Sequence, residues 1–196
     1  MNTPILILVC LLAYLLGSIP IGVLVAKESG INIQQVGSGN IGATNVARNL
    51  GSKKGMVVGV LDFFKSFLPA VLVFQFLSLD WQVMLVSIMP VLGHIFPVWL
   101  NFKGGKGVAT IFGILAGFFG PLKFLVFIVL WFLALRLINV MSLVNLIVGL
   151  LMPLGFWLNF RNITFALFGA GLGLILWWTH RENIQRLLAG NENKLR

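Results

Sequence analysis

Long apolar runs with few or no charged side chains are the feature that most constrains this chain. An α-helix needs about 17–25 mostly apolar residues to cross a bilayer, and each run is long enough. Hydrophobic residues make up 59% of the sequence and charged residues 10%, whereas soluble domains carry about 25% charged residues. A soluble core of this size cannot bury so much apolar surface. The candidate spans are Thr3–Ala26, Gly55–Leu79, Trp81–Phe102, Gly107–Leu135, Leu137–Phe160 and Asn162–Thr179.

The run Gly107–Leu135 is longer than one span requires and is interrupted by Gly120 and Pro121. Glycine followed by proline is typical of a turn, so we expect two short helices joined there. The sequence therefore predicts an all-α polytopic membrane protein with seven transmembrane helices. We expect residues 1–196 to form a single domain.

Basic residues set the predicted orientation. With the N-terminus outside, 11 of the 14 lysines and arginines fall on the cytoplasmic side and two fall outside. Cytoplasmic loops carry an excess of basic residues, so we predict an outer N-terminus and a cytoplasmic C-terminus. No basic segment precedes the first run, and we expect no cleaved signal peptide. Three polar segments then share the cytoplasmic face: Glu28–Lys54, Asn101–Gly107 and His180–Arg196.

The first polar segment has the composition of a phosphate-binding loop. Its glycines let the backbone approach a ligand closely, and Arg48 supplies a planar cation suited to phosphate. A short helix starting near Asn40 would add N-terminal amides to an anion site. The candidate ligands are Ser38, Asn40, Thr44, Asn45 and Arg48.

Two other interpretations of this segment are weaker. It contains the pattern G-x-G-x-x-G, with Asp62 twenty residues after Gly42. A dinucleotide-binding fingerprint requires a preceding strand and a βαβ unit, and here Asp62 lies in an apolar run. A flexible polar linker is the simpler alternative, although four glycines, three asparagines and an arginine within residues 36–51 are unusual for mere linkage.

The second segment places two lysines among three glycines at the start of a predicted helix. Exposed amides and ammonium groups together form a cradle for a dianion. The motif is not a Walker A loop, because Leu100 occupies the position of its first glycine. Anchoring to anionic lipid headgroups is the alternative. The candidate ligands are Lys103, Gly104, Gly105, Lys106 and Gly107.

The third segment follows the last run. His180 and Asn183 are three residues apart and would share a helix face; an interfacial amphipathic helix is the alternative. Asp62 and Lys65 have the same spacing inside the second run, where we favour a structural ion pair over direct catalysis. His94 is at least as compatible with a packed helix histidine as with a catalytic one. The lone Cys10 excludes an internal disulfide.

Taken together and in this order, the three segments resemble the bacterial acyl-phosphate:glycerol-3-phosphate acyltransferases, the PlsY family. The resemblance runs from Leu16-Gly-Ser-Ile-Pro20 to the His180 segment, and Ser66 stands where we expect glycine. It implies transfer of a fatty acyl group from acyl phosphate to the 1-hydroxyl of sn-glycerol 3-phosphate, which gives lysophosphatidate and phosphate. It also implies a multi-pass protein of the bacterial inner membrane with a cytoplasmic active site.

The resemblance assigns roles to the candidate residues. The implied catalytic residues are Arg48, Lys106, His180 and Asn183, which with Ser38 would bind glycerol 3-phosphate. Residues 103–107, with Asn40, Thr44 and Asn45, would hold the acyl phosphate headgroup. We expect no cofactor, metal or nucleic acid, and a monomer surrounded by membrane lipid.

The composition of the polar segments fits this chemistry. An acyl phosphate is already activated, so the protein must chiefly position a hydroxyl and stabilise two phosphates. The H-x-x-x-x-D signature of the other major glycerol-phosphate acyltransferase class is absent. A transporter for a small organic phosphate and an accessory membrane protein remain as alternatives. A transporter predicts a polar path across the membrane, for which only Asn139, Ser142 and Asn145 are candidates.

Overall fold

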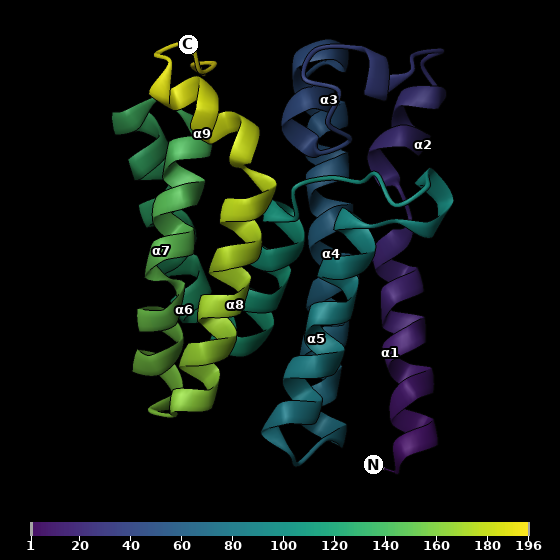
Figure 1. Ribbon diagram of the computed structural model, residues 1–196, viewed down its shortest axis with the longest axis vertical. Coiled ribbons are helices and arrows are strands. Elements are labelled where there is room, and N and C mark those ends of the chain that lie inside the picture. Colours follow the sequence, from purple (N-terminus) through teal and green to yellow (C-terminus); the bar gives the residue numbers. More distant parts are fainter. Residues whose placement is uncertain (1, 196) are drawn as a thin grey trace. The chain divides into compact units, whose positions relative to one another are not determined.

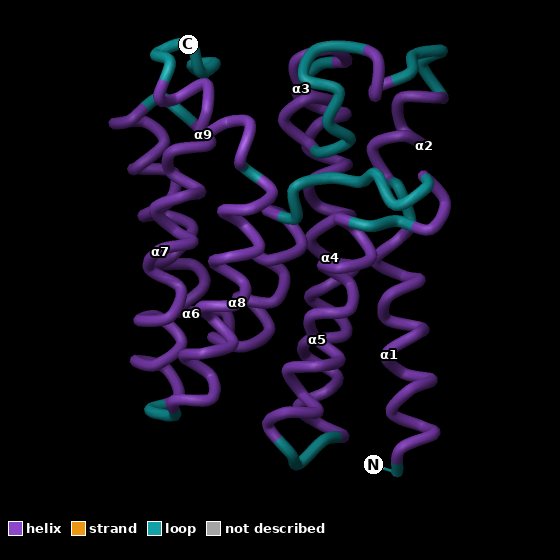
Figure 2. Tube along the Cα trace, viewed as in Figure 1, coloured by secondary structure: helices purple, strands orange, loops and turns teal. Residues whose placement is uncertain are grey.

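The computed structural model describes residues 2–195, and in that range the chain consists of helices joined by loops (Figures 1 and 2), without a strand. This confirms the predicted all-α class. The chain divides into two compact units, Met1–Phe118 and Phe119–Arg196, which are described separately below. The single-domain organisation of residues 1–196 stays a prediction. The helices are α1 (Thr3–Ser18), α2 (Ile21–Lys27), η1 (Ile33–Gln35), α3 (Ala43–Leu50), α4 (Ser52–Phe76), α5 (Asp80–Ile95), η2 (Val98–Leu100), α6 (Val108–Ile138), α7 (Met141–Phe160), α8 (Ile163–Thr179) and α9 (Arg181–Leu188).

Several helices are long and apolar enough to cross a membrane. Five such segments occur among the described residues, and the bent pair α8 and α9, which turn by 62°, raises the number to six. Helix α6 counts once in this total, although Gly120 inside it leaves the helical conformation (φ 77°, ψ 169°). The predicted break at Gly120 and Pro121 is therefore confirmed, whereas the predicted total of seven spans stays a prediction.

Helices α1, α4 and α5 form the framework of the first unit, together with the beginning of α6. Glycine lets α1 and α5 approach closely, because a Cβ on Gly93 would lie 2.2 Å from the carbonyl oxygen of Tyr14. Lipid provides little hydrophobic drive for helices to associate, so small residues at such contacts matter. Ser66 of α4 is fully buried and faces Gly113 of α6, whose lack of a side chain makes room for the serine.

Helices α7 and α8 pack closely in the second unit. A Cβ on Gly173 would lie 2.3 Å from the carbonyl oxygen of Gly149. Polar side chains of this unit are paired internally, as a bilayer requires. The indole N–H of Trp131 donates to Asn145 Oδ1 at 3.1 Å, and that of Trp177 donates to the carbonyl of Leu146 at 3.0 Å.

Candidate functional site

Asn45 organises the first polar segment. Its side chain is 2% exposed, and its Nδ2 group donates to the carbonyls of Ile33, Val36 and Asn40 at 3.3, 3.0 and 2.9 Å. Its Oδ1 accepts the amide of Ser38 at 3.0 Å. One buried amide thus holds four points of the loop that precedes it. Asn45 was predicted to contact the acyl phosphate headgroup, but its hydrogen bonds here are to the loop itself.

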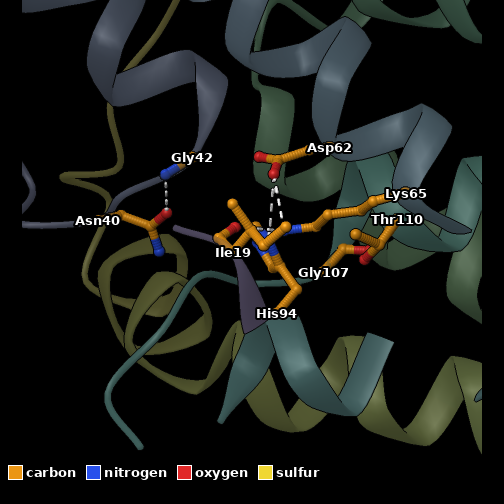
Figure 3. Close-up of polar contacts among 8 residues, drawn as sticks. All are labelled: Ile19, Asn40, Gly42, Asp62, Lys65, His94, Gly107 and Thr110. Carbon is orange, nitrogen blue, oxygen red and sulfur yellow. Dashed lines mark hydrogen bonds and ion pairs between the residues drawn. The ribbon is translucent and has the colours of Figure 1, made fainter. Parts of the chain in front are cut away.

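The loop reaches α3 through a tight turn and a capped helix start. Gly37 and Gly39 both have positive φ (59° and 68°), a conformation that glycine adopts without strain. Asn40 Oδ1 accepts the amide of Gly42 at 2.8 Å, immediately before the first residue of α3 (Figure 3). The helix conditionally expected near Asn40 therefore exists, and it starts at Ala43.

Two predicted phosphate ligands lie on one face of α3. Thr44 and Arg48 are four residues apart, a spacing that places side chains on the same side of a helix. Arg48 and Ser38 are exposed, and Thr44 is half-buried. The amide of Asn45 donates to the carbonyl of Gly42 at 3.1 Å, whereas the first two amides of a helix have no intrahelical acceptor. A cation, a hydroxyl and helix amides therefore occur together in this segment.

The first and second segments share an apolar base. Ile33, Ile41 and Val46, from the first segment, are buried in a cluster with Ala26 and Val58. Leu100, which closely precedes Lys103, packs against the same cluster. The fold therefore brings together, within the first unit, two segments that are 47 residues apart in sequence, from Lys54 to Asn101.

The second segment, Lys103–Gly107, folds back onto the end of α5. The amide of Gly104 donates to the carbonyl of Ile95, and that of Gly105 to the carbonyl of His94, both at 3.0 Å. These two amides were expected to be exposed anion donors, but they close the loop instead. Lys103 is exposed and Lys106 is half-buried, so the ammonium groups and the start of α6 carry the anion-binding potential of this loop.

A buried ionic cluster lies under this loop (Figure 3). Lys65 Nζ is 2.9 Å from Asp62 Oδ1, which confirms the predicted ion pair. The same ammonium lies 2.9 Å from His94 Nδ1 and 3.2 Å from the carbonyl oxygen of Ile19. Asp62, Lys65 and His94 are at most 5% exposed. His94 is therefore a packed, hydrogen-bonded histidine, which is one of the two interpretations that the sequence allowed.

The third segment lies in the second unit. His180 is the C-cap residue of α8 and is 3% exposed; its Nδ1 is 2.8 Å from the carbonyl oxygen of Leu176. Because a carbonyl only accepts, Nδ1 carries a proton, and Nε2 is the acceptor of the neutral ring. Asn183 of α9 is 7% exposed, and its Nδ2 donates to Glu192 Oε1 at 2.6 Å.

Glu192 ties the chain's C-terminal segment to α7 and α9. Besides Asn183, it accepts from Ser142 Oγ at 2.9 Å and from Arg186 Nε at 2.7 Å. Partial burial alone would raise the pKa of Glu192, but these hydrogen bonds and the charge of Arg186 bring it below the ordinary value of 4.5. The carboxylate is therefore the form that the fold favours.

We expect the stability of the folded protein to depend on the charge of Glu192. Its folded-state pKa lies below its unfolded-state pKa, so its contribution is fully present above pH 4.5 and is lost as the pH falls through the lower folded-state value. The measurement is the unfolding temperature of detergent-purified protein from pH 6 down to pH 3. Glu192→Gln should flatten the acid part of this profile. An unchanged acid profile in that variant would contradict the role of the carboxylate.

The comparisons with known proteins agree with the resemblance seen in the sequence. Residues 7–190 match the family model described as Glycerol-3-phosphate acyltransferase. This chain belongs to that family. Glycerol-3-phosphate acyltransferases similar to it include one from Nitrobacter winogradskyi, 43% identical over 93% of this chain and 92% of the relative. Another, from Aquifex aeolicus, is 38% identical over 93% and 95%.

Solved structures of the family show the same fold. A crystal structure of PlsY, an integral membrane glycerol 3-phosphate acyltransferase, in its glycerol 3-phosphate form has a TM-score of 0.91 and 36% identity to this chain, covering 97% of this chain and 96% of PlsY. The lysophosphatidic acid form of PlsY has a TM-score of 0.89 and 35% identity, over 97% and 95%. The chain is therefore an integral membrane protein of the PlsY type.

Sequence reasoning missed several polar residues of this glycerol-3-phosphate acyltransferase fold. Glu192 was given no role from the sequence, and its contact with Ser142, fifty residues away, has no local signal. The contact between Lys65 and His94 joins two helices and was not foreseen. A charged residue inside an apolar run was the available signal, because such residues are usually paired or functional.

Proposed function

We propose that this acyltransferase uses acyl phosphate as its acyl donor and esterifies the 1-hydroxyl of sn-glycerol 3-phosphate. The observation that carries the proposal is the shared apolar base of two glycine-rich loops, which together offer three cations, Arg48, Lys103 and Lys106. Two phosphate groups must be neutralised in this reaction. A site of fixed cations and amides supplies that stabilisation without an acyl-enzyme intermediate.

The proposed roles follow the chemistry of each side chain. Arg48 and Lys106, with Ser38, bind the phosphate of glycerol 3-phosphate, and His180 and Asn183 act on the same substrate. Asn40, Thr44 and the Lys103–Gly107 loop hold the acyl phosphate headgroup. We assign Asn45 to positioning these groups, because its amide is engaged with the loop backbone.

The proposed reaction is a single acyl transfer. The oxygen of the 1-hydroxyl forms a bond to the acyl carbon, and the bond between that carbon and the phosphate oxygen breaks. The products are lysophosphatidate and inorganic phosphate, and the hydroxyl proton passes to a phosphate oxygen. Neutral His180 is the competing acceptor, since its Nδ1 bond to Leu176 leaves Nε2 as the ring's acceptor.

Replacing His180 with glutamine separates these two roles. Glutamine retains an amide near the position of Nε2 but cannot act as a base. If His180 only binds substrate, we expect the variant's KM for glycerol 3-phosphate to rise about tenfold, which corresponds to one hydrogen bond of about 1.4 kcal/mol, with kcat nearly unchanged. Steady-state kinetics of His180→Gln and His180→Ala provide the test. A large loss of kcat in both variants would instead assign the proton transfer to His180.

We also propose seven spans, with the N-terminus outside and the site on the cytoplasmic side of a bacterial inner membrane. The basic-residue distribution and the break at Gly120 support this topology. Cysteines introduced at Lys53 and Lys123, in a Cys10→Ser chain, should be labelled from opposite sides of sealed membranes. Labelling of both from one side would overturn it. We further propose that the protein acts as a monomer in lipid, for which the mass of the active detergent-solubilised particle is the measurement.

The direct test of the donor uses purified protein, palmitoyl phosphate and glycerol 3-phosphate. We expect lysophosphatidate and phosphate to appear in equal amounts, without coenzyme A, acyl carrier protein or added metal. Activity with palmitoyl-coenzyme A alone would overturn the choice of donor. Absence of lysophosphatidate with every donor would favour the transporter or accessory alternatives.

The internal pairing of polar residues argues against a transport path. Asn145 is 2% exposed and bonded to Trp131, and Ser142 is bonded to Glu192. The carbonyl of Asn139 accepts the amide of Leu195 at 3.0 Å. These were the candidate polar residues for a path across the membrane, and each is engaged within the second unit.

A further inference from the structure

The ammonium group of Lys65 lies close to three acceptor atoms, one of them in an ion pair. An ammonium has three N–H donors, and its three partners here are a carboxylate oxygen of Asp62 at 2.9 Å, His94 Nδ1 at 2.9 Å and the carbonyl of Ile19 at 3.2 Å. The carbonyl belongs to the C-cap residue that follows Ser18, the last residue of α1. One buried cation thus joins α1, α4 and α5.

These contacts determine the state of the His94 ring. Lys65 can only donate, so His94 Nδ1 accepts and the proton of the neutral ring lies on Nε2. The alternative, a proton on Nδ1 shared with Asp62, would have to span 3.5 Å, beyond the usual 2.7–3.2 Å of an N–H···O hydrogen bond. Lys65 therefore sets both the tautomer and the orientation of this imidazole.

The other side of the His94 ring lies against the Lys103–Gly107 loop. A Cβ on Gly105 would lie 2.1 Å from His94 Nε2 and 2.9 Å from Cε1, so the loop backbone rests on the ring. The carbonyls of His94 and Ile95 also accept the amides of Gly105 and Gly104. Direct contacts therefore connect Lys65 to His94, and His94 to the Lys103–Gly107 loop.

Stabilisation of the folded protein does not by itself account for a buried ionic cluster at this position. Replacing a buried ion pair with apolar residues of similar volume is often neutral or even stabilising, and the surroundings here are apolar helices. The His94 side of the cluster, by contrast, contacts the Lys103–Gly107 loop. This loop carries two of the three cations in the proposed phosphate site.

We infer that Lys65 and His94 are positioning residues, which fix the Lys103–Gly107 loop in its phosphate-binding shape without touching substrate. The link to phosphate binding rests on the proposed function. The link to the shape of the loop does not, since it depends only on contacts within the protein.

The test uses variants that keep different parts of the imidazole. His94→Asn retains an acceptor near the position of Nδ1 but lacks the ring atoms that lie against Gly105. His94→Gln retains a polar group near Nε2 but loses that acceptor, and His94→Phe keeps a ring but has neither nitrogen. We measure hydrogen–deuterium exchange of the Gly104 and Gly105 amides, with amides of α7 as the internal control. We expect exchange at least about tenfold faster in all three variants, since each breaks a contact between Lys65 and the loop, and no change in α7.

Steady-state kinetics provide the second measurement. We expect the three variants to show a KM about tenfold higher for a phosphate substrate and a nearly unchanged kcat. Should the Phe variant not fold, the Asn and Gln variants still decide. Unchanged loop exchange in the Gln variant, or equal acceleration in α7, would overturn the inference. If wild-type protein makes no lysophosphatidate, the proposed function fails while the exchange experiment still tests the loop.

Discussion

Asn45→Ala is expected to unfold the first polar segment and to lower activity at least about 100-fold. The change removes the acceptor of the Ser38 amide and the side-chain donor to the carbonyls of Ile33 and Asn40. It also removes one of two donors to the carbonyl of Val36, which keeps the amide of Gly39. Each buried polar group left without a partner costs about 1–3 kcal/mol, and 2.8 kcal/mol already corresponds to a factor of 100. Limited proteolysis within residues 31–50 and the rate of lysophosphatidate formation are the measurements.

Asn49→Ala is the matched control for this experiment. Asn49 Nδ2 donates to the backbone oxygen of Asn45 at 2.9 Å and to its Oδ1 at 3.1 Å, and its side chain is exposed. Its loss should cost less than about 1 kcal/mol. Similar proteolysis and activity in the two variants would contradict the conclusion that the Asn45 side chain holds the loop that precedes it.

Arg48→Ala is expected to lower kcat/KM for glycerol 3-phosphate about 1000-fold, with the protein still folded. Arg48 is exposed near the end of α3, so its removal leaves no buried gap. Two hydrogen bonds from a guanidinium to phosphate contribute about 1.5–3 kcal/mol each. Arg48→Lys, which keeps the charge but not the forked geometry, should recover part of this loss.

Lys53→Ala is the control for net charge. Lys53 is also exposed and basic, near the start of α4, and it has no proposed contact with substrate. We expect its kcat/KM to stay close to that of the wild type. Equal losses for Arg48→Ala and Lys53→Ala would mean that the general positive charge of this face matters, rather than a specific contact.

The local features of the fold could be predicted from sequence because they depend on local signals. Apolar runs predicted the long helices, and Gly120 with Pro121 predicted the break in α6. The spacing of Asp62 and Lys65 predicted their ion pair, since three residues along a helix bring side chains together. The Gly- and Lys-rich segments, combined with the family resemblance, gave the class of enzyme.

Contacts between distant elements were beyond sequence reasoning. Asn45 looked like a ligand because asparagines suit polar sites, but the carbonyls that it holds are presented only once the loop has folded. Gly104 and Gly105 looked like free amide donors, yet their partners lie at the end of α5. Nothing in the spacing of Lys65 and His94 indicates that they meet. Such pairings arise from helix packing, which periodicity does not encode.

In the proposed function, Arg48 and His180 act on one glycerol 3-phosphate molecule. A double-mutant cycle on kcat/KM with Arg48→Lys, His180→Gln and the double variant tests it most directly. Residues that share a partner show coupling of about 0.5–3 kcal/mol, whereas independent ones add within about 0.3–0.5 kcal/mol. We predict coupling of at least about 1 kcal/mol. Either change alone weakens binding of the phosphate, so the second change costs less binding free energy than it does in the wild type. Strict additivity of the two changes would contradict the account.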